Sequence, residues 1–174
     1  TMVMNKTNIF PYQNLLNHFQ TVSLDDLDRV RLLDRKDTKF VFNQIDLPHI
    51  LEKLKPFYRI LEINNNRVYT YDTTYFDTDN FLFYVQHHNG SRNRFKVRFR
   101  KYSSNKKSYF EVKIKNNKNR TIKKRLKVDK MNEHLGNQEM DLVSKITGLS
   151  PSQLTPKLDL EFSRITLTDK NFNE

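Results

Sequence analysis

Basic side chains recur at every second position in three consecutive segments of the chain, and this spacing is the strongest chemical signal in the sequence. Successive side chains of a β-strand point to opposite faces, so residues two apart share a face. Read as strands, residues 93–102, 108–115 and 121–128 each place Lys or Arg on one face and mostly apolar side chains on the other. The cations on these shared faces are Arg94, Lys96, Arg98, Arg100, Lys113, Lys115, Lys123, Arg125 and Lys127.

Only one acid, Glu111, accompanies these cations on the three faces. Like charges directly opposite on paired strands destabilise a sheet, and the solvated faces of soluble sheets usually mix both signs. For any one strand, an ordinary solvated face is the simpler interpretation. Across three neighbouring strands, the excess of positive charge favours a bound polyanion that relieves the repulsion. Both the guanidinium group of Arg and the ammonium group of Lys bind phosphate oxygens.

The aromatic residues of these segments indicate which polyanion is bound. Proteins that bind single-stranded nucleic acid interleave basic residues with aromatic platforms on which bases stack. Here Phe95, Phe99 and Phe110 fall on the apolar faces, away from the cations. We therefore favour a bare phosphate chain over nucleic acid and expect no sequence-specific nucleic-acid binding.

Composition agrees with an anionic partner but does not select one. The 174 residues have a net charge of +11. Such a charge could bind an anion, but it would also be expected in a protein whose charge only keeps it soluble. Three glycines and the absence of GxxxxGK[ST] or GxGxxG sequences exclude nucleotide binding through a P-loop or a Rossmann motif.

The remaining chemistry is limited by what the sequence lacks. It contains no cysteine, so disulfides, Cys-ligated zinc and thiol catalysis are excluded, and its five His show no metal-site spacing. No apolar run has the roughly 20 residues of a membrane span, and the first ten residues do not resemble a signal peptide. We expect a cytoplasmic protein, and leave open its attachment to the inner membrane surface through a partner.

The elements that must position the basic residues follow from periodicity and capping signals. Helices are predicted within residues 12–34, where Ser23 and Asp26 form a capping box, from Asp46 to about residue 57, and over 137–147, ending at Gly148. Further strands are predicted at 35–42, 67–77, 81–87 and 157–168, with Asn89-Gly90 as a tight turn. The fold class is therefore α+β, with an antiparallel sheet and flanking helices.

At these same residues the chain resembles the polyphosphate-polymerase domain of the VTC (vacuolar transporter chaperone) family, in the triphosphate tunnel metalloenzyme superfamily. Each matching segment is short, but the six occur in the family's order over about residues 35–167. They are RKDTKF at 35–40, YFDT at 75–78, KVRFRKY at 96–102, FEVK at 110–113, TIKKRL at 121–126 and FSRITL at 162–167.

The resemblance implies an eight-stranded antiparallel β tunnel that binds ATP and inorganic polyphosphate, uses a divalent metal (Mn²⁺ or Mg²⁺) and transfers the ATP γ-phosphate to the polyphosphate end. Oligomer formation is left open. Glu111 is expected to orient Lys113 through an ion pair, with metal ligation as the alternative. By motif, the implied catalytic residues are Lys39, Arg98, Arg100, Lys113, Lys123 and Arg125, and further phosphate contacts fall to Arg94, Lys96, Lys115 and Arg164.

The sequence departs from the family pattern at both ends of the match. The family continues with another Arg-bearing strand, a metal-binding Glu and a late tunnel Lys, none of which is found here. We therefore expect a single tunnel domain over 1–174 (helices in 1–34, tunnel strands and packing helices in 35–174) that lacks its C-terminal strands. Its polymerase activity is expected to be impaired or absent, with the intact parent protein as the enzyme. Hydrolases of the superfamily usually begin with an ExExK strand that holds a metal ion. The equivalent positions in this chain are Arg35, Asp37 and Lys39, so Arg replaces the first carboxylate.

Three hypotheses remain open from the sequence. The first is an ATP-dependent polyphosphate polymerase, the second a tunnel hydrolase that cleaves triphosphate or polyphosphate, and the third a non-catalytic module that binds polyphosphate or nucleic acid. The Arg at position 35 weakens the second, and the position of the aromatic residues weakens nucleic acid in the third.

Overall fold

The computed structural model describes residues 2–4, 12–29, 38–103, 105–116 and 121–170. They form two compact units with separate cores. One comprises residues 1–70 with 162–174, and the other comprises Tyr71–Glu161. In the described part of the chain, no helix is long and apolar enough to cross a membrane.

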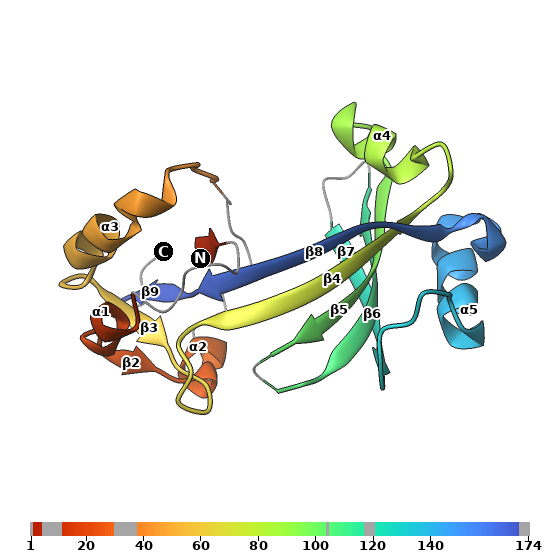
Figure 1. Cartoon of the computed structure of the whole chain (residues 1–174). Helices are drawn as coiled ribbons and strands as arrows, with labels where there is room; N and C mark the ends of the chain where they lie inside the picture. The colour runs from red at the N-terminus through yellow and green to blue at the C-terminus, as the bar shows by residue number, and fades with distance from the viewer. Residues whose placement is uncertain (1, 5–11, 30–37, 104, 117–120, 171–174) are drawn as a thin grey trace. The chain divides into compact units, whose positions relative to one another are not determined.

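A five-stranded sheet forms the body of the unit Tyr71–Glu161 (Figure 1). Its strand order is β8-β4-β5-β6-β7, and strand β1 (Met2–Met4) of the other unit adds a sixth strand next to β8. The pairings β4–β5, β5–β6 and β6–β7 are antiparallel and join strands that are consecutive in the sequence. The bounds of the strands are β4 Tyr69–Asp77, β5 Arg94–Tyr102, β6 Ser108–Lys115, β7 Thr121–Val128 and β8 Thr155–Ile165.

The apolar face of this sheet makes the core. Val97, Phe99, Phe110 and Val112 have no exposed surface. They cluster with Val143 of helix α5 (Asn137–Thr147) and with Leu154, which follows the short helix η4 (Pro151–Gln153). Helix α5 matches its predicted bounds and ends at Gly148, whose positive φ of 71° a residue with a side chain adopts only under strain. Because this face is packed, the basic face is the one left for a ligand.

The segment 81–87, predicted as a strand, is helical instead. Helix α4 spans Leu82–His88. Its first turn is fixed by Asp77, whose carboxylate accepts hydrogen bonds from the N–H groups of Thr78, Phe83 and Tyr84. Satisfying these helix N-terminal donors stabilises the helix, and Phe83 is buried in the core below it. The apolar residues of 81–87 are compatible with a strand, but Asp77 and Thr78 just before them accept hydrogen bonds from the first N–H groups of a helix.

The other unit has a small sheet of its own, ordered β2-β3-β9, with β2 at Thr21–Val22, β3 at Tyr58–Leu61 and β9 at Leu167–Asp169. Strand β1 (Met2–Met4) pairs antiparallel with the end of β8, where Met2 lies opposite Ile165. Its core gathers side chains from α1, α3, β3 and the end of β8: Leu16, Phe19, Leu47, Leu51, Ile60 and Ile165. The helices are α1 Gln13–Asn17, α2 Leu24–Arg29, the 3₁₀ helix η3 Gln44–Asp46 and α3 Leu47–Leu54.

Predictions for this unit had mixed outcomes. The capping box is confirmed, because Ser23 Oγ accepts from the Asp26 N–H while the Asp26 carboxylate accepts from the Ser23 N–H. Asp46 precedes α3, but its side chain makes no capping hydrogen bond. The strand predicted at 35–42 is wrong over residues 38–42, which form no strand and leave Phe40 and Val41 exposed. Arg35 and Asp37 lie outside the described residues.

The fold class is confirmed as α+β with an antiparallel sheet and flanking helices. The sheet is open, however, because among the described strands β7 pairs only with β6. The basic face is therefore the wall of an open sheet.

Candidate polyanion-binding site

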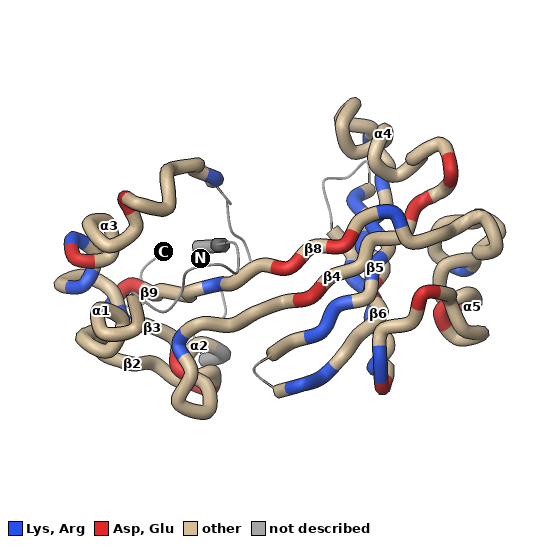
Figure 2. The backbone as a smooth tube through the Cα atoms, viewed as in Figure 1, with Lys and Arg blue, Asp and Glu red and all other residues tan. Residues whose placement is uncertain are grey.

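The register of β5, β6 and β7 aligns the basic residues in rows across the sheet. Lys96 lies opposite Lys113, and Lys113 lies opposite Lys123. One step along, Arg98 lies opposite Glu111, which lies opposite Arg125. The predicted alternation is thus confirmed for all three strands, and we call this surface the cationic face. In Figure 2 the Lys and Arg positions of this unit gather on β5 and β6, whereas acidic positions mark β4 and β8.

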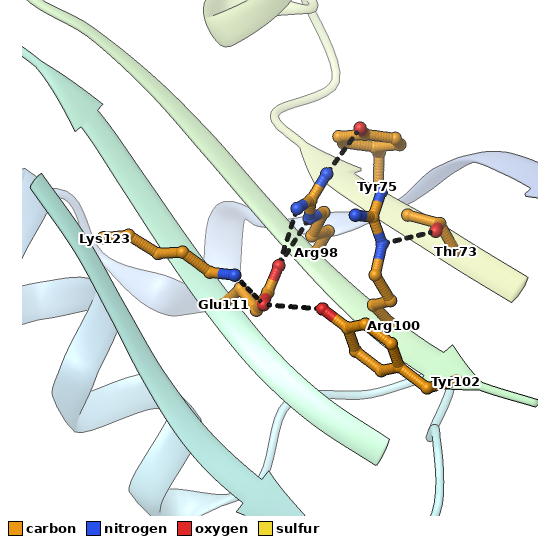
Figure 3. A network of polar contacts seen from close by, with 7 residues as sticks. All are labelled: Thr73, Tyr75, Arg98, Arg100, Tyr102, Glu111 and Lys123. Carbon is orange, nitrogen blue, oxygen red and sulfur yellow. Dashed lines mark hydrogen bonds and ion pairs between the residues drawn. The ribbon is translucent and has the colours of Figure 1, made fainter. Parts of the chain in front are cut away.

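Glu111 lies at the centre of the cationic face with only 1% of its surface exposed. Nε and Nη2 of Arg98 donate to its Oε2 at 2.8 and 2.7 Å. Its other oxygen, Oε1, forms an ion pair with Lys123 and accepts from the Tyr102 hydroxyl at 3.5 Å (Figure 3). The expected ion pair between Glu111 and Lys113 is therefore wrong, because Glu111 pairs with Arg98 and Lys123 instead. Lys113 lies two residues further along β6 and is exposed.

The two central arginines are held from the β4 side. Nη1 of Arg98 donates to the Tyr75 hydroxyl at 3.0 Å, and Nε of Arg100 donates to Thr73 Oγ1 at 3.0 Å (Figure 3). The Arg100 guanidinium also lies 5.6 Å from the ring centre of Tyr71, a cation–π contact. These contacts fix the guanidinium planes before any ligand arrives, which lowers the entropic cost of binding.

This wall of hydroxyl and aromatic side chains was not predicted as part of the site. Tyr69, Tyr71, Thr73 and Tyr75 occur at every second position, so the sequence already placed them on one face of β4. What it did not show was that β4 pairs with β5 in a register that sets Thr73 against Arg100 and Tyr75 against Arg98.

The electrostatics of the site reflect burial and the crowding of charges. Burial opposes ionisation of Glu111, but the hydrogen bond from Lys123 and the charge of Arg98 outweigh it and lower the pKa of the carboxyl. Burial and the charge of Arg98 lower the pKa of the Arg100 guanidinium. Burial and the Glu111 charge raise the pKa of the Tyr102 hydroxyl. An anion bound beside Arg100 would counter the effect of Arg98.

The structure brings together eight of the ten cations predicted for the site, on β5, β6 and β7 of one unit: Arg94, Lys96, Arg98, Arg100, Lys113, Lys115, Lys123 and Arg125. The other two belong to the other unit. Lys39 lies in the exposed stretch before η3, and Arg164 lies on β8 with its guanidinium 5.9 Å from the Phe162 ring centre. Phosphate binding by these two stays a prediction.

Comparison with family models decides the wider relationship. Residues 34–173 match the model of the VTC domain. The chain belongs to the VTC domain family. This confirms the resemblance carried by the six short motifs, and membership supports a role related to polyphosphate polymerisation at the level of the family. Neither the curated proteins nor the solved structures contain a match to the chain.

The residues of the cationic face do not fit a resident divalent metal as they are arranged. Both oxygens of Glu111 are engaged by cationic side chains, so a metal ion there would have to displace Arg98 or Lys123. Within the described residues, no group of three or more His, Cys, Asp or Glu could hold a metal ion. The dependence on Mn²⁺ or Mg²⁺ stays a prediction.

Proposed function

We propose that the cationic face of this VTC domain holds linear phosphate chains and aligns ATP with a polyphosphate end for transfer of the γ-phosphoryl group. The supporting observation is the nine-cation face with Glu111 as its single acid. That acid is enclosed by Arg98 and Lys123, so little negative charge reaches the surface that an anion would approach.

The proposed reaction requires alignment and charge neutralisation more than acid–base chemistry. A terminal oxygen of polyphosphate forms a bond to the γ-phosphorus, the bond from this phosphorus to the β,γ-bridging oxygen breaks, and ADP leaves. Such transfers pass through a state with charge on the equatorial oxygens, which preorganised cations stabilise. No general base is needed, because the attacking phosphate oxygen is already an anion.

The cations would divide this work by geometry. Arg98 and Arg100, held by Tyr75 and Thr73, offer planar donors for phosphate oxygens. Lys96 and Lys113, opposite each other one step along, supply point charges, and the Lys96 ammonium is held 3.2 Å from Nε2 of His87 on α4. Arg125 is exposed with its guanidinium 4.9 Å from the Tyr109 ring centre, at the open side of the face.

Calorimetric titration with tripolyphosphate tests the binding half of the proposal. The double variant Arg98→Ala/Arg100→Ala is expected to lose measurable binding. Because these arginines are largely buried, a second variant, Lys113→Glu/Arg125→Glu, changes only exposed side chains and should lose binding as well. The matched control is Lys101→Ala/Lys124→Ala, which removes exposed cations of β5 and β7 from the opposite face. Equal affinity in all four proteins would refute the site.

Incubation with ATP, Mn²⁺ and a polyphosphate primer tests the catalytic half. Lengthening of the polymer with release of ADP supports transfer. Release of orthophosphate without any lengthening of the polymer would instead make the protein a hydrolase. Binding of tripolyphosphate without either product would limit the function to polyphosphate binding.

A further inference from the structure

A cavity of 690 Å³ opens beside the cationic face, within the unit Tyr71–Glu161. It lies between helix α4, strand β8 and the adjoining ends of β4 and β5. Its walls are largely aromatic and aliphatic and include Tyr75, Phe81, Phe83, Tyr84, Leu158 and Leu160. The exposed fractions of Tyr84 (61%) and Leu158 (51%) show that part of this apolar wall faces solvent.

Two residues of the cavity wall connect it to the cationic face. Lys96 belongs to the row with Lys113 and Lys123 and also lines the cavity. Tyr75 also lines the cavity, and its hydroxyl accepts the hydrogen bond from Nη1 of Arg98. A ligand in the cavity therefore reaches the first cations without crossing any other element.

A ligand that complements both surfaces joins an apolar or aromatic group to a chain of phosphates, and a nucleoside triphosphate is of this type. Bare polyphosphate would match the cations and leave the apolar walls in water. A nucleobase would place its π face against aromatic rings, a contact worth about 1–3 kcal/mol per base. The volume also lies in the range of roughly 300–1,000 Å³ that is usual for small-molecule sites.

We propose that this cavity is the nucleobase subsite, so that the base of ATP lies between α4 and β8 while its phosphates run from Lys96 towards Arg98 and Arg100. This inference rests on the proposed function and adds a direction to it. The nucleotide enters at the α4 end of β5. Because residues two apart on a strand are separated by about 7 Å, the terminal phosphate then lies near Arg98 and Arg100.

Photolabelling with 8-azido-ATP tests the location directly. Illumination, digestion and mass spectrometry should find the label on peptides containing residues 80–87 or 157–160. Excess ATP should prevent the labelling, whereas excess tripolyphosphate should prevent it less well. Label confined to peptides outside the cavity would overturn the inference.

Binding to two ligands separates this inference from the proposed function. Tyr84→Ala and Leu158→Ala should each lower the affinity for ATP roughly tenfold. Neither should change the affinity for tripolyphosphate, which has no base. The control Ile122→Ala removes an aliphatic side chain of β7 that is 44% exposed, against 51% for Leu158, and does not line the cavity, so it should change neither affinity.

The outcomes are distinct. Loss of tripolyphosphate binding in the Arg98→Ala/Arg100→Ala variant together with unchanged ATP affinity in both cavity variants would leave the proposed function in place and refute the base subsite. Failure of the parent protein to bind either ligand would refute both.

Discussion

Arg98 donates from Nε and Nη2 to one oxygen of Glu111, while its Nη1 donates to the Tyr75 hydroxyl. The carboxylate thus takes up two of the donating nitrogens of the most central arginine on the cationic face. Burying an acid among cations removes repulsion that would otherwise build up across β5, β6 and β7. The same acid competes with an incoming phosphate for the same donors. Glu111 therefore positions Arg98 but lowers the affinity of the face for phosphate.

The first prediction concerns these two effects of Glu111. Glu111→Gln should raise the affinity for tripolyphosphate severalfold, because it removes a negative charge and releases Arg98 and Lys123. Transfer at saturating ATP should nevertheless slow, because these two side chains lose the group that positions them. The free energy of unfolding should fall by roughly 1–3 kcal/mol, the usual cost of leaving buried polar groups poorly paired.

The split between tighter binding and slower turnover separates positioning from a purely structural role. Calorimetry and steady-state kinetics on the same preparations measure it, with Asp141→Asn on the surface of α5 as the control. Weaker binding in Glu111→Gln would contradict the proposed competition.

A second prediction concerns acid stability. Burial opposes the charge on Glu111, but Lys123 and Arg98 prevail and lower its folded pKa below the ordinary value of 4.5. A lowered folded pKa means that the stabilisation is fully present above the unfolded pKa and is lost as the pH falls through the folded one.

The wild-type protein should therefore lose stability below pH 4.5 more steeply than Glu111→Gln, which has no carboxyl to protonate at this position. Urea unfolding at intervals from neutral pH downwards gives both curves, and their difference removes the contribution of the other carboxylates. Parallel curves through this range would show that the Glu111 ion pairs add no stability.

The third prediction isolates the hydroxyl of Tyr75. Tyr75→Phe keeps the aromatic ring of a residue that lines the cavity and removes the acceptor for Nη1 of Arg98. A neutral acceptor lost from a charged donor costs about 1.5–3 kcal/mol at most, so tripolyphosphate affinity should fall roughly tenfold while the fold is kept. Tyr58→Phe, in the other unit, is the control. Equal affinities in the two variants would mean that Arg98 is positioned by Glu111 alone.

The sequence predicted the cationic face well because its strands are local. Each of β5, β6 and β7 pairs with its sequence neighbour, so alternation alone decides which side chains share a face. The bounds of β6, β7 and α5 were predicted to the residue. Glu111 was recognised as the single acid, but its partners depend on cross-strand register, which alternation does not supply.

The failures have physical causes of the same kind. The apolar side chains within residues 82–88 are compatible with the period of a strand and with that of a helix. The carboxylate of Asp77 favours the helix, because it accepts hydrogen bonds from the N–H groups of Phe83 and Tyr84. Residues 38–42 are β-branched or aromatic except for Lys39, yet a strand needs a partner strand, and none of the described strands pairs with them. The cavity beside α4 could not be predicted, because it depends on that helix and on β8, which follows α5 in the chain.

The last prediction joins the helix to the cavity. Asp77→Ala removes the acceptor for the N–H groups of Thr78, Phe83 and Tyr84, so the first turn of α4 should open. Losing a side-chain cap costs about 0.5–2 kcal/mol, and hydrogen exchange at Phe83 and Tyr84 should accelerate while the amides of β6 stay protected. Asp79→Ala, which removes a carboxylate two residues away that is 91% exposed, should leave exchange unchanged.

Because α4 forms one wall of the cavity but none of the cationic face, Asp77→Ala should weaken ATP binding and spare tripolyphosphate. Equal weakening for both ligands would show that α4 supports the phosphate site itself.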